Sequence, residues 1–120
     1  MTVAPLILAV DHNRRNLELL SEVFSMAGYE TVSASTLEEL SQALADPQTV
    51  RLALVDLAGF DRGIWDYCER LQERKIPFLV VSPKLSSQIK KESLAHGASG
   101  FVVKPLVIRE LLALVQTLLE

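Results

Sequence analysis

Short apolar runs alternate with longer segments of helical periodicity along this chain. Apolar runs of about four to eight residues that are bounded by polar residues suit strands buried on both faces of a sheet. Such runs occupy 5–10, 52–55, 78–81 and 100–103, and residues 29–34 alternate as a shorter strand. The pattern therefore predicts five strands, of which the stretch 51–56 is the central one.

The segments between these runs carry apolar residues at helical spacing. The spacing predicts helices over about 14–27, over a segment that holds 37–44, over 64–71, over about 87–95, and over a last segment that holds 111–119. Asn13 and the Ser86-Ser87 pair are the expected caps of the first and fourth helices. Ser35 with Glu38 three residues later predicts a capping box for the second helix, and Asp46-Pro47 is expected to end it.

Five strands that alternate with helices predict crossover connections, a parallel sheet and helices on both of its faces. A chain of 120 residues is long enough for one domain with one core, so we expect residues 1–120 to form a single domain. The predicted fold is a three-layer (βα)5 α/β domain of the flavodoxin-like kind, with strand order 2-1-3-4-5.

Four of the apolar runs end on a polar side chain: Asp11, Asp56, Ser82 and Lys104. Parallel strands end at the same edge of a sheet, so we expect these four side chains to converge, with Asp11 beside Asp56 at the switch point. Taken singly, each residue is more often a helix cap, a loop hydroxyl or a solvated lysine. Four in succession instead indicate a site that binds a phosphoryl group or accepts one on a carboxylate.

The segments around these positions resemble the receiver domain of two-component response regulators. The resemblance rests on Val10-Asp11, on Leu54 to Leu57, on Val80 to Ser82 and above all on Gly97 to Pro105, and it covers the whole chain. It implies that Asp56 accepts a phosphoryl group from a histidine kinase or a phosphotransfer protein. It also implies that the Lys104-Pro105 bond is cis, as it often is in such domains.

The resemblance assigns a role to each of the other residues at this edge. Lys104 would neutralise the phosphoryl oxygens, Ser82 would swing inward to hydrogen-bond them, and Phe101 would occupy the aromatic switch position. The cofactor would be Mg²⁺, bound by Asp11, Asp56 and the backbone carbonyl of Ala58.

Three features depart from the family pattern. His12 replaces the usual second acid after the first strand. Imidazole suits softer metals better than Mg²⁺, so the affinity for Mg²⁺ should fall. His12 is nevertheless a further candidate metal ligand. Pro83 follows the switch hydroxyl and has no N–H to donate to a phosphoryl group. The loop 57–63 is short and lacks the usual Met-Pro pair, which puts the carbonyl of Ala58 in doubt.

Composition narrows the environment and the partners. Net charge is −3 and the basic residues are scattered, so direct nucleic-acid binding by this domain is not expected. Cys68 is the sole cysteine, which fits a reducing compartment. No apolar run approaches about 18 residues, so no membrane span is expected and the predicted location is cytoplasmic.

Three function classes remain. The first is a phosphorylated signalling switch, which is not an enzyme. The second is a phosphorylation-independent pseudo-receiver, motivated by His12 and Pro83. The last helix also has surplus leucine, which suggests either a pairing surface, as in a homodimer through the last helices, or continuation into another helix. The third is a metal-dependent hydrolase, which would need a general acid or base that only His12 offers.

Overall fold

Five parallel strands form one sheet in the order β2-β1-β3-β4-β5 in the computed structural model, which describes residues 4–45 and 49–120. The strands are β1 (Leu6–Val10), β2 (Glu30–Ala34), β3 (Val50–Asp56), β4 (Phe78–Ser82) and β5 (Gly100–Val103). The helices are α1 (Arg14–Met26), α2 (Leu37–Ala45), α3 (Ile64–Glu73), α4 (Ser87–Ala95) and α5 (Ile108–Leu119). The predicted number of strands, their order and their parallel pairing are confirmed.

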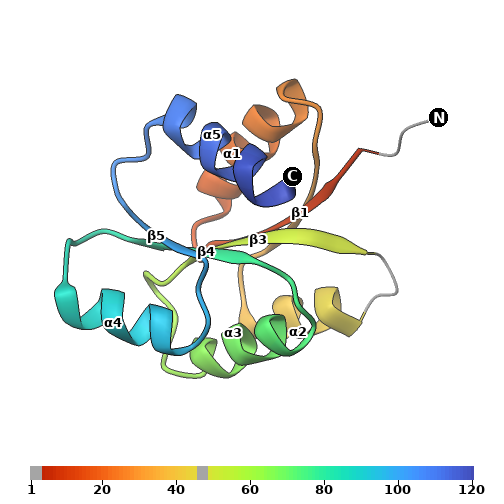
Figure 1. Ribbon diagram of the computed structural model, residues 1–120. Coiled ribbons are helices and arrows are strands. Elements are labelled where there is room, and N and C mark those ends of the chain that lie inside the picture. Colours follow the sequence, from red (N-terminus) through yellow and green to blue (C-terminus); the bar gives the residue numbers. More distant parts are fainter. Residues whose placement is uncertain (1–3, 46–48) are drawn as a thin grey trace.

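The helices divide unequally between the two faces of the sheet. Helices α1 and α5 cover one face, whereas α2, α3 and α4 cover the other (Figure 1). This division follows from the strand order, because the chain reverses its direction of travel across the sheet after β2. The three-layer fold predicted from the sequence is therefore confirmed.

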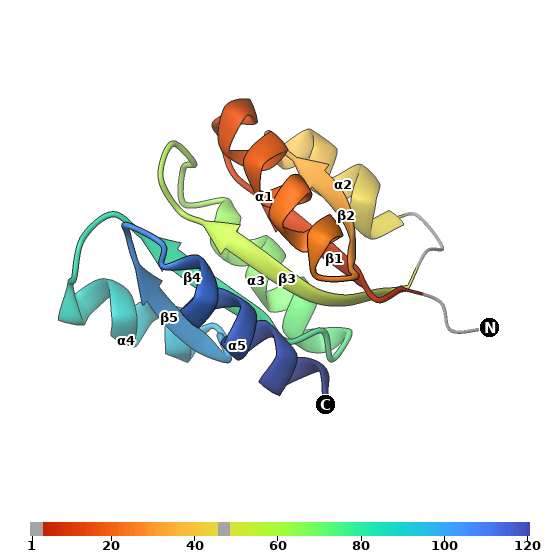
Figure 2. The same ribbon diagram turned by 90° about the horizontal axis from the view of Figure 1, so that it is seen from above.

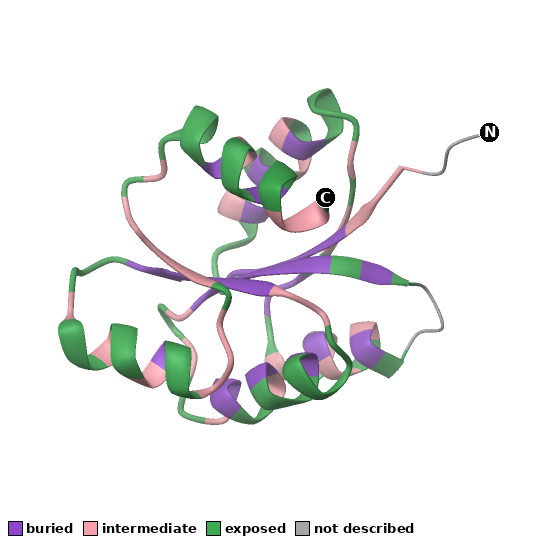
Figure 3. Ribbon diagram, in the orientation of Figure 1, coloured by how far each residue is buried: buried purple, intermediate pink, exposed green. Residues whose placement is uncertain are grey.

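Alternation along the strands builds two cores, one on each side of the sheet. In β3, Leu52 and Leu54 face α1 and α5, whereas Ala53 and Val55 face α2 and α3. The three central strands are almost entirely buried, as the purple ribbon in Figure 3 shows. The positions of these strands that are buried on both faces are apolar, and apart from the exposed Arg51 near the start of β3 their polar side chains come at or directly after the carboxyl ends.

Two predicted helix caps are confirmed. The Asn13 side chain accepts hydrogen bonds from the N–H groups of Arg15 and Asn16 at the start of α1, and Ser86 accepts one from Ile89 at the start of α4. Such caps satisfy N–H groups that have no partner within the helix. Helix α1 ends at Met26, one residue before the predicted end.

The predicted capping box of α2 is wrong by one residue. Thr36, not Ser35, accepts a hydrogen bond from the N–H of Glu39, at 3.0 Å, and the Glu39 carboxylate receives the N–H and hydroxyl of Ser35. Ser35 with Glu38 and Thr36 with Glu39 both have the spacing of a capping box, so the sequence pattern fits either pair. Ser35 is buried immediately after β2. The predicted helix end at Asp46-Pro47 lies outside the described residues.

Helix α4 is the most weakly anchored of the helices on its face. Its buried residue is Ser93, whose hydroxyl donates to the carbonyl of Ile89 within the helix itself. Its ties to the rest of the domain are largely polar. Glu92 pairs with Arg62 in the loop after β3, and the His96 ring at the helix end stacks on buried Trp65, with 4.8 Å between ring centroids.

We expect the backbone amides of α4 to exchange with solvent deuterium at least about tenfold faster than those of α5, because local opening of α4 exposes little apolar surface. Helix α5 buries Leu111 and Val115 and serves as the internal control. Hydrogen–deuterium exchange measured by mass spectrometry checks this, and equal protection of the two helices would contradict it.

Candidate functional site

Two acids and a lysine meet at the carboxyl edge of the sheet. Asp56 is the last residue of β3, and Asp11 and Lys104 directly follow β1 and β5. The N–H of Asp11 donates to the carbonyl of Ala34 and that of Lys104 donates to the carbonyl of Ser82, so the ladder fixes both positions. The ammonium of Lys104 forms an ion pair with Oδ2 of Asp56.

Both carboxylates of this group are buried, which makes their negative charge costly. Asp11 and Asp56 expose only 5% and 4% of their surface. Burial raises the pKa of Asp11 above its ordinary value, and the nearby charge of Asp56 raises it further, while the N–H of Asn13 and the charge of Lys104 act in the opposite direction. Two carboxylates therefore share one nearby ammonium.

Backbone N–H groups hold both carboxylates in place. The N–H of Asn13 donates to Oδ1 of Asp11 at 2.8 Å, and the N–H of Ala58 donates to Oδ1 of Asp56 at 3.0 Å. Each bond closes a short turn directly after a strand, which leaves the second oxygen of each carboxylate directed elsewhere. The structure thus gives Ala58 a role through its N–H, whereas the predicted role of its carbonyl stays a prediction.

The hydroxyl of Ser82 forms its hydrogen bonds with Lys84 and not with the three charged side chains. Its hydroxyl donates to the carbonyl of Lys84 at 3.0 Å and accepts from the N–H of Lys84 at 3.3 Å, across Pro83. Strand register gives the reason. Asp56 is paired with Val81, so Ser82 is one residue further along β4 and, by alternation, belongs to the opposite face of the sheet.

His12 lies over the loop that follows β3. Its side chain is exposed, and its ring meets that of Phe60 edge-on with 6.0 Å between centroids. A Cβ on Gly59 would stand 2.8 Å from Cγ of His12, and the φ of Gly59 is +83°, so this position suits only glycine. Within residues 4–45 and 49–120, no three acidic, histidine or cysteine side chains are grouped to hold a metal ion, so His12 does not complete a set with the two acids.

The predicted switch residue Phe101 and two other residues, Asp61 and Cys68, are each held by structural contacts. Phe101 is half-buried and packs against the core on the α3 side of the sheet. Asp61, in the loop after β3, accepts the N–H of Gly63 at 2.8 Å and so shapes that loop. Cys68 is fully buried, which raises the pKa of its thiol to about 12, so it belongs to the core and is no nucleophile at neutral pH.

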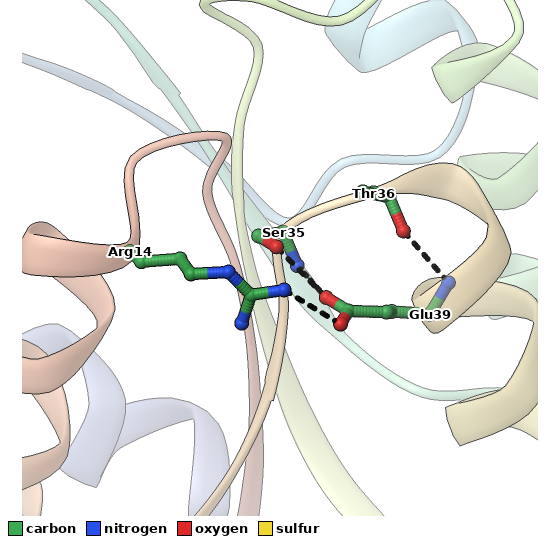
Figure 4. A network of polar contacts seen from close by, with 4 residues as sticks. All are labelled: Arg14, Ser35, Thr36 and Glu39. Carbon is green, nitrogen blue, oxygen red and sulfur yellow. Dashed lines mark hydrogen bonds and ion pairs between the residues drawn. The ribbon is translucent and has the colours of Figure 1, made fainter.

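A polar network joins the two loops on the β1 and β2 side of this edge. Figure 4 shows Glu39 at the centre of this network. One oxygen of its carboxylate accepts hydrogen bonds from the N–H and the hydroxyl of Ser35, and the other pairs with the guanidinium of Arg14 at 2.9 Å. Arg14 begins α1 directly after the Asp11 loop, and Glu39 lies in the first turn of α2. Sequence analysis missed this contact because 25 residues separate the pair and no local pattern signals it.

A flavodoxin-like sheet with paired acids and a lysine at its carboxyl edge defines a class of α/β domains with an acidic site at the switch point. The sequence matches the family described as the response regulator receiver domain over residues 7–116. The chain therefore belongs to this family, the receiver domains of two-component response regulators, and the resemblance drawn from the sequence is confirmed.

Individual relatives agree with this assignment. The chain is 28% identical over 118 residues to the transcriptional regulatory protein GltR of Pseudomonas aeruginosa, covering 95% of this chain and 48% of that protein. A CheY-like receiver domain protein of Methanospirillum hungatei superposes with a TM-score of 0.86 at 26% identity, covering 98% of this chain and 94% of that one. The chemotaxis response regulator CheY4 of Vibrio cholerae superposes with a TM-score of 0.81 at 26% identity, covering 97% of this chain and 99% of that one. The chain spans about half the length of the curated relatives it matches.

The Glu39 network predicts a pH-dependent stability. Hydrogen bonds from the N–H and hydroxyl of Ser35, and then Arg14, lower the pKa of Glu39 from 4.5 to about 2. A depressed carboxylate pKa stabilises the fold above the ordinary pKa, and the contribution disappears as pH falls toward the depressed value. We expect Glu39→Gln to lower the urea midpoint at pH 7, and the gap from the natural protein to close between about pH 5 and pH 2.

Glu38→Gln is the matched control, because Glu38 is exposed, occupies the same helical turn and interacts equally with the helix dipole. Its effect should be small at every pH. Equal effects of the two substitutions would attribute the stabilisation to the dipole alone and contradict a role for the Ser35 and Arg14 contacts.

Proposed function

We propose that this chain is a phosphoacceptor switch in which Asp56 receives a phosphoryl group from a histidine kinase or a phosphotransfer protein. Receiver domains of this family are signalling modules that interact with such partners. The observation that carries the proposal for these residues is the ion pair of Lys104 with a buried Asp56 beside Asp11. We also propose that residues 1–120 act as one receiver unit.

In the proposed reaction a carboxylate oxygen of Asp56 attacks the phosphorus of the donor. The bond between phosphorus and the donor nitrogen or oxygen breaks, and the leaving group departs with the electron pair. The ion pair with Lys104 holds the Asp56 carboxylate in position before the transfer. Afterwards the same ammonium is available to the new phosphoryl oxygens, because the carboxylate has lost its charge.

Receiver domains typically bind Mg²⁺ at the phosphorylation site. The donor set here is compatible with such an ion, because Mg²⁺ takes one or two carboxylates together with water and phosphate oxygens. The charge of Asp56 that raises the pKa of Asp11 is the kind of repulsion that a divalent cation relieves. We propose that Asp11, Asp56 and the carbonyl of Ala58 would hold the ion, weakly because His12 contributes no negative charge; bound Mg²⁺ would neutralise charge on the phosphoryl group.

The switch would require two side chains to leave their present contacts. The hydroxyl of Ser82 would exchange Lys84 for a phosphoryl oxygen, and Phe101 would adjust on the α3 side of the sheet. Pro83 offers no N–H to the phosphoryl group, so Ser82 and Lys104 would provide the hydrogen bonds from this side. The contact between Arg62 and Glu92 would carry a change in the loop after Asp56 to α4.

A homodimer through the last helices remains a proposal. Leu112, Leu118 and Leu119 in α5 pack against the core, so most of the surplus leucine is explained by packing. Leu114 and Val107 stay about half exposed and would supply the apolar centre of a pairing surface. We propose no direct nucleic-acid or membrane role for the domain. No helix in residues 4–45 and 49–120 has both the length and the apolar character to cross a bilayer.

Incubation with acetyl phosphate and Mg²⁺ should add the mass of one phosphoryl group to the natural protein and none to Asp56→Asn. Asp61→Asn is the matched control, because it removes a neighbouring loop acid that only shapes the loop, and it should still be modified. Intact-protein mass spectrometry checks all three proteins.

Addition of a phosphoryl group to Asp56→Asn would show that another residue is the phosphoacceptor. No modification of the natural protein with Mg²⁺ or Mn²⁺ would overturn the phosphoacceptor proposal. Signalling in cells that persists in Asp56→Asn would favour the phosphorylation-independent pseudo-receiver instead.

His12→Asp should tighten Mg²⁺ binding by at least about tenfold. One added negative charge about 4 Å from a divalent ion is worth roughly 2 kcal/mol in a water-like medium, and about 1.4 kcal/mol corresponds to tenfold. Titration followed by isothermal calorimetry measures the affinity. His12→Asn removes the imidazole without adding charge and should leave the affinity nearly unchanged, so equal gains in the two variants would point to steric relief by loss of the ring.

A further inference from the structure

Strand β2 forms one edge of the sheet. It stands first in the strand order, and β1 is its one neighbouring strand among the described residues. Figure 2 shows β2 at the outer margin of the sheet, with β1 between it and β3. Glu30 and Ser33 are exposed, so solvent reaches this edge. A free edge of this kind is a template for pairing with another strand.

The backbone groups that β2 offers to another strand belong to Thr31 and Ser33. The N–H of Glu30 donates to a carbonyl directly before β1, and the carbonyl of Ala34 accepts an N–H directly after β1. Both residues therefore direct their backbone groups toward β1. Because this direction alternates from one residue to the next in a parallel pair, Thr31 and Ser33 direct their N–H and carbonyl groups to the open side.

Strand β2 lacks the features that usually protect an edge. Its five residues, ETVSA, include no lysine and no proline, and they pair with β1 without a register shift. The opposite edge differs, because β5 has four residues and leads into Lys104-Pro105. Short length, lysine, proline and bulges are the usual means of blocking an edge. The edge at β2 is therefore the one that is open to pairing.

Two hollows lie between β2 and α1. One of about 320 Å³ is lined in part by Ser21, Ser25 and Thr31, and one of about 360 Å³ is lined in part by Ser21, Glu18 and Ser33. The serines of α1 are small, so the helix leaves room beside the strand. Within the described part of the chain, Oγ1 of Thr31 is buried there without a hydrogen-bond partner. Such a hydroxyl normally has one.

We propose that a second copy of this chain pairs with β2 in antiparallel orientation, about a two-fold axis at Val32. Thr31 of each copy then stands opposite Ser33 of the other, and each such pair exchanges two backbone hydrogen bonds. The Thr31 and Ser33 hydroxyls meet on the α1 side as cross-strand pairs, which gives Oγ1 of Thr31 a partner. The two sheets become one continuous sheet.

The charge of the strand selects this register. Glu30 is the one charged residue of β2. In the proposed pairing the two Glu30 residues lie four residues apart along the strand, about 13 Å, which exceeds the screening length of about 8 Å at physiological salt. A shift that placed Thr31 opposite itself would bring them to about 7 Å. The opposite shift would place Thr31 opposite Ser35, outside the strand.

This surface is separate from the one at Leu114 and Val107 and involves neither Asp56 nor its neighbours in the site. The proposal therefore goes beyond the phosphoacceptor function and does not depend on it.

Disulfide trapping with diamide as the oxidant tests the register. Val32 would meet its own copy in a pair without backbone hydrogen bonds, where the Cα atoms are about 4.5 Å apart, a separation that a disulfide bridges. Val32→Cys should therefore become a covalent dimer, measured by non-reducing electrophoresis. The natural protein should stay monomeric, because Cys68 is buried.

Glu30→Cys is the matched control. Glu30 lies on the same face of β2 as Val32 and is more exposed, so random collisions would trap it at least as fast. The proposed pairing holds the two positions about 13 Å apart, and a disulfide cannot span more than about 7 Å between Cα atoms. Trapping of Glu30→Cys should be at least about tenfold slower than that of Val32→Cys.

Two substitutions at Ser33, each combined with Val32→Cys, separate the backbone from the side chain. Ser33→Pro removes an N–H that makes no bond to β1, so it should slow trapping at least about tenfold while the domain stays folded by circular dichroism. Ser33→Ala keeps the N–H and should slow trapping much less. Leu114→Glu changes the surface on α5 and should leave the rate of trapping unchanged.

The natural protein provides a test without substitution. Raising its concentration into the millimolar range should shift the ¹H–¹⁵N resonances of Thr31 and Ser33 more than those of β5, because their N–H groups gain partners.

The proposal is overturned if Glu30→Cys is trapped as fast as Val32→Cys, if Ser33→Pro leaves trapping unchanged, or if the Thr31 and Ser33 resonances do not depend on concentration. Slower trapping in Leu114→Glu would also overturn it, because the copies would then associate through α5. A failure of acetyl phosphate to modify the protein bears on the phosphoacceptor proposal and leaves these outcomes unaffected.

Discussion

The sharing of one ammonium by two buried carboxylates is the constraint on which this domain depends. An unpaired buried charge is costly, and removing one partner of a buried ion pair commonly costs about 3–5 kcal/mol. Lys104 meets Asp56 directly, while Asp11 has neutral hydrogen-bond donors and the more distant charge of Lys104. The parallel sheet makes this arrangement possible, because strands that end at one edge bring residues far apart in the chain into contact.

The surrounding loops support this edge with bonds of short range. The turns at Asn13 and Ala58 fix one oxygen of each acid, and the contact of Glu39 with Arg14 joins the loops that follow β1 and β2. Gly59 lets the His12 ring lie against the loop after β3, where any larger residue would collide with it. His12 thus packs on this loop through its aromatic contact with Phe60. An acid at this position would offer a charge instead of a ring.

Most of the fold could be predicted from the sequence because its signals are local and repeated. Four apolar runs, one alternating strand, the helical periodicity between them and the caps at Asn13 and Ser86 each depend on a few neighbouring residues. Together they allow little besides a parallel sheet with helices on both faces. The frame of the α2 cap could not be predicted, because Ser35-Thr36 and Glu38-Glu39 offer two equivalent registers and burial of Ser35 decides between them.

The candidate site could be predicted less completely. That Asp11, Asp56 and Lys104 meet follows from strand ends alone. The bonding of the Ser82 hydroxyl to Lys84 instead accompanies a register with β3 that places Val81 opposite Asp56 and that the sequence does not specify. The contact of Arg14 with Glu39 depends on how the helices pack.

The stacking of His96 on Trp65 has a practical consequence for anyone who studies this molecule in solution. The chain contains one tryptophan, so its tryptophan fluorescence originates from a single side chain, which lies where α3 meets the end of α4. An indole in contact with an imidazole senses both the distance and the protonation of that ring. The emission spectrum therefore reports on the docking of the most weakly anchored helix without any attached dye.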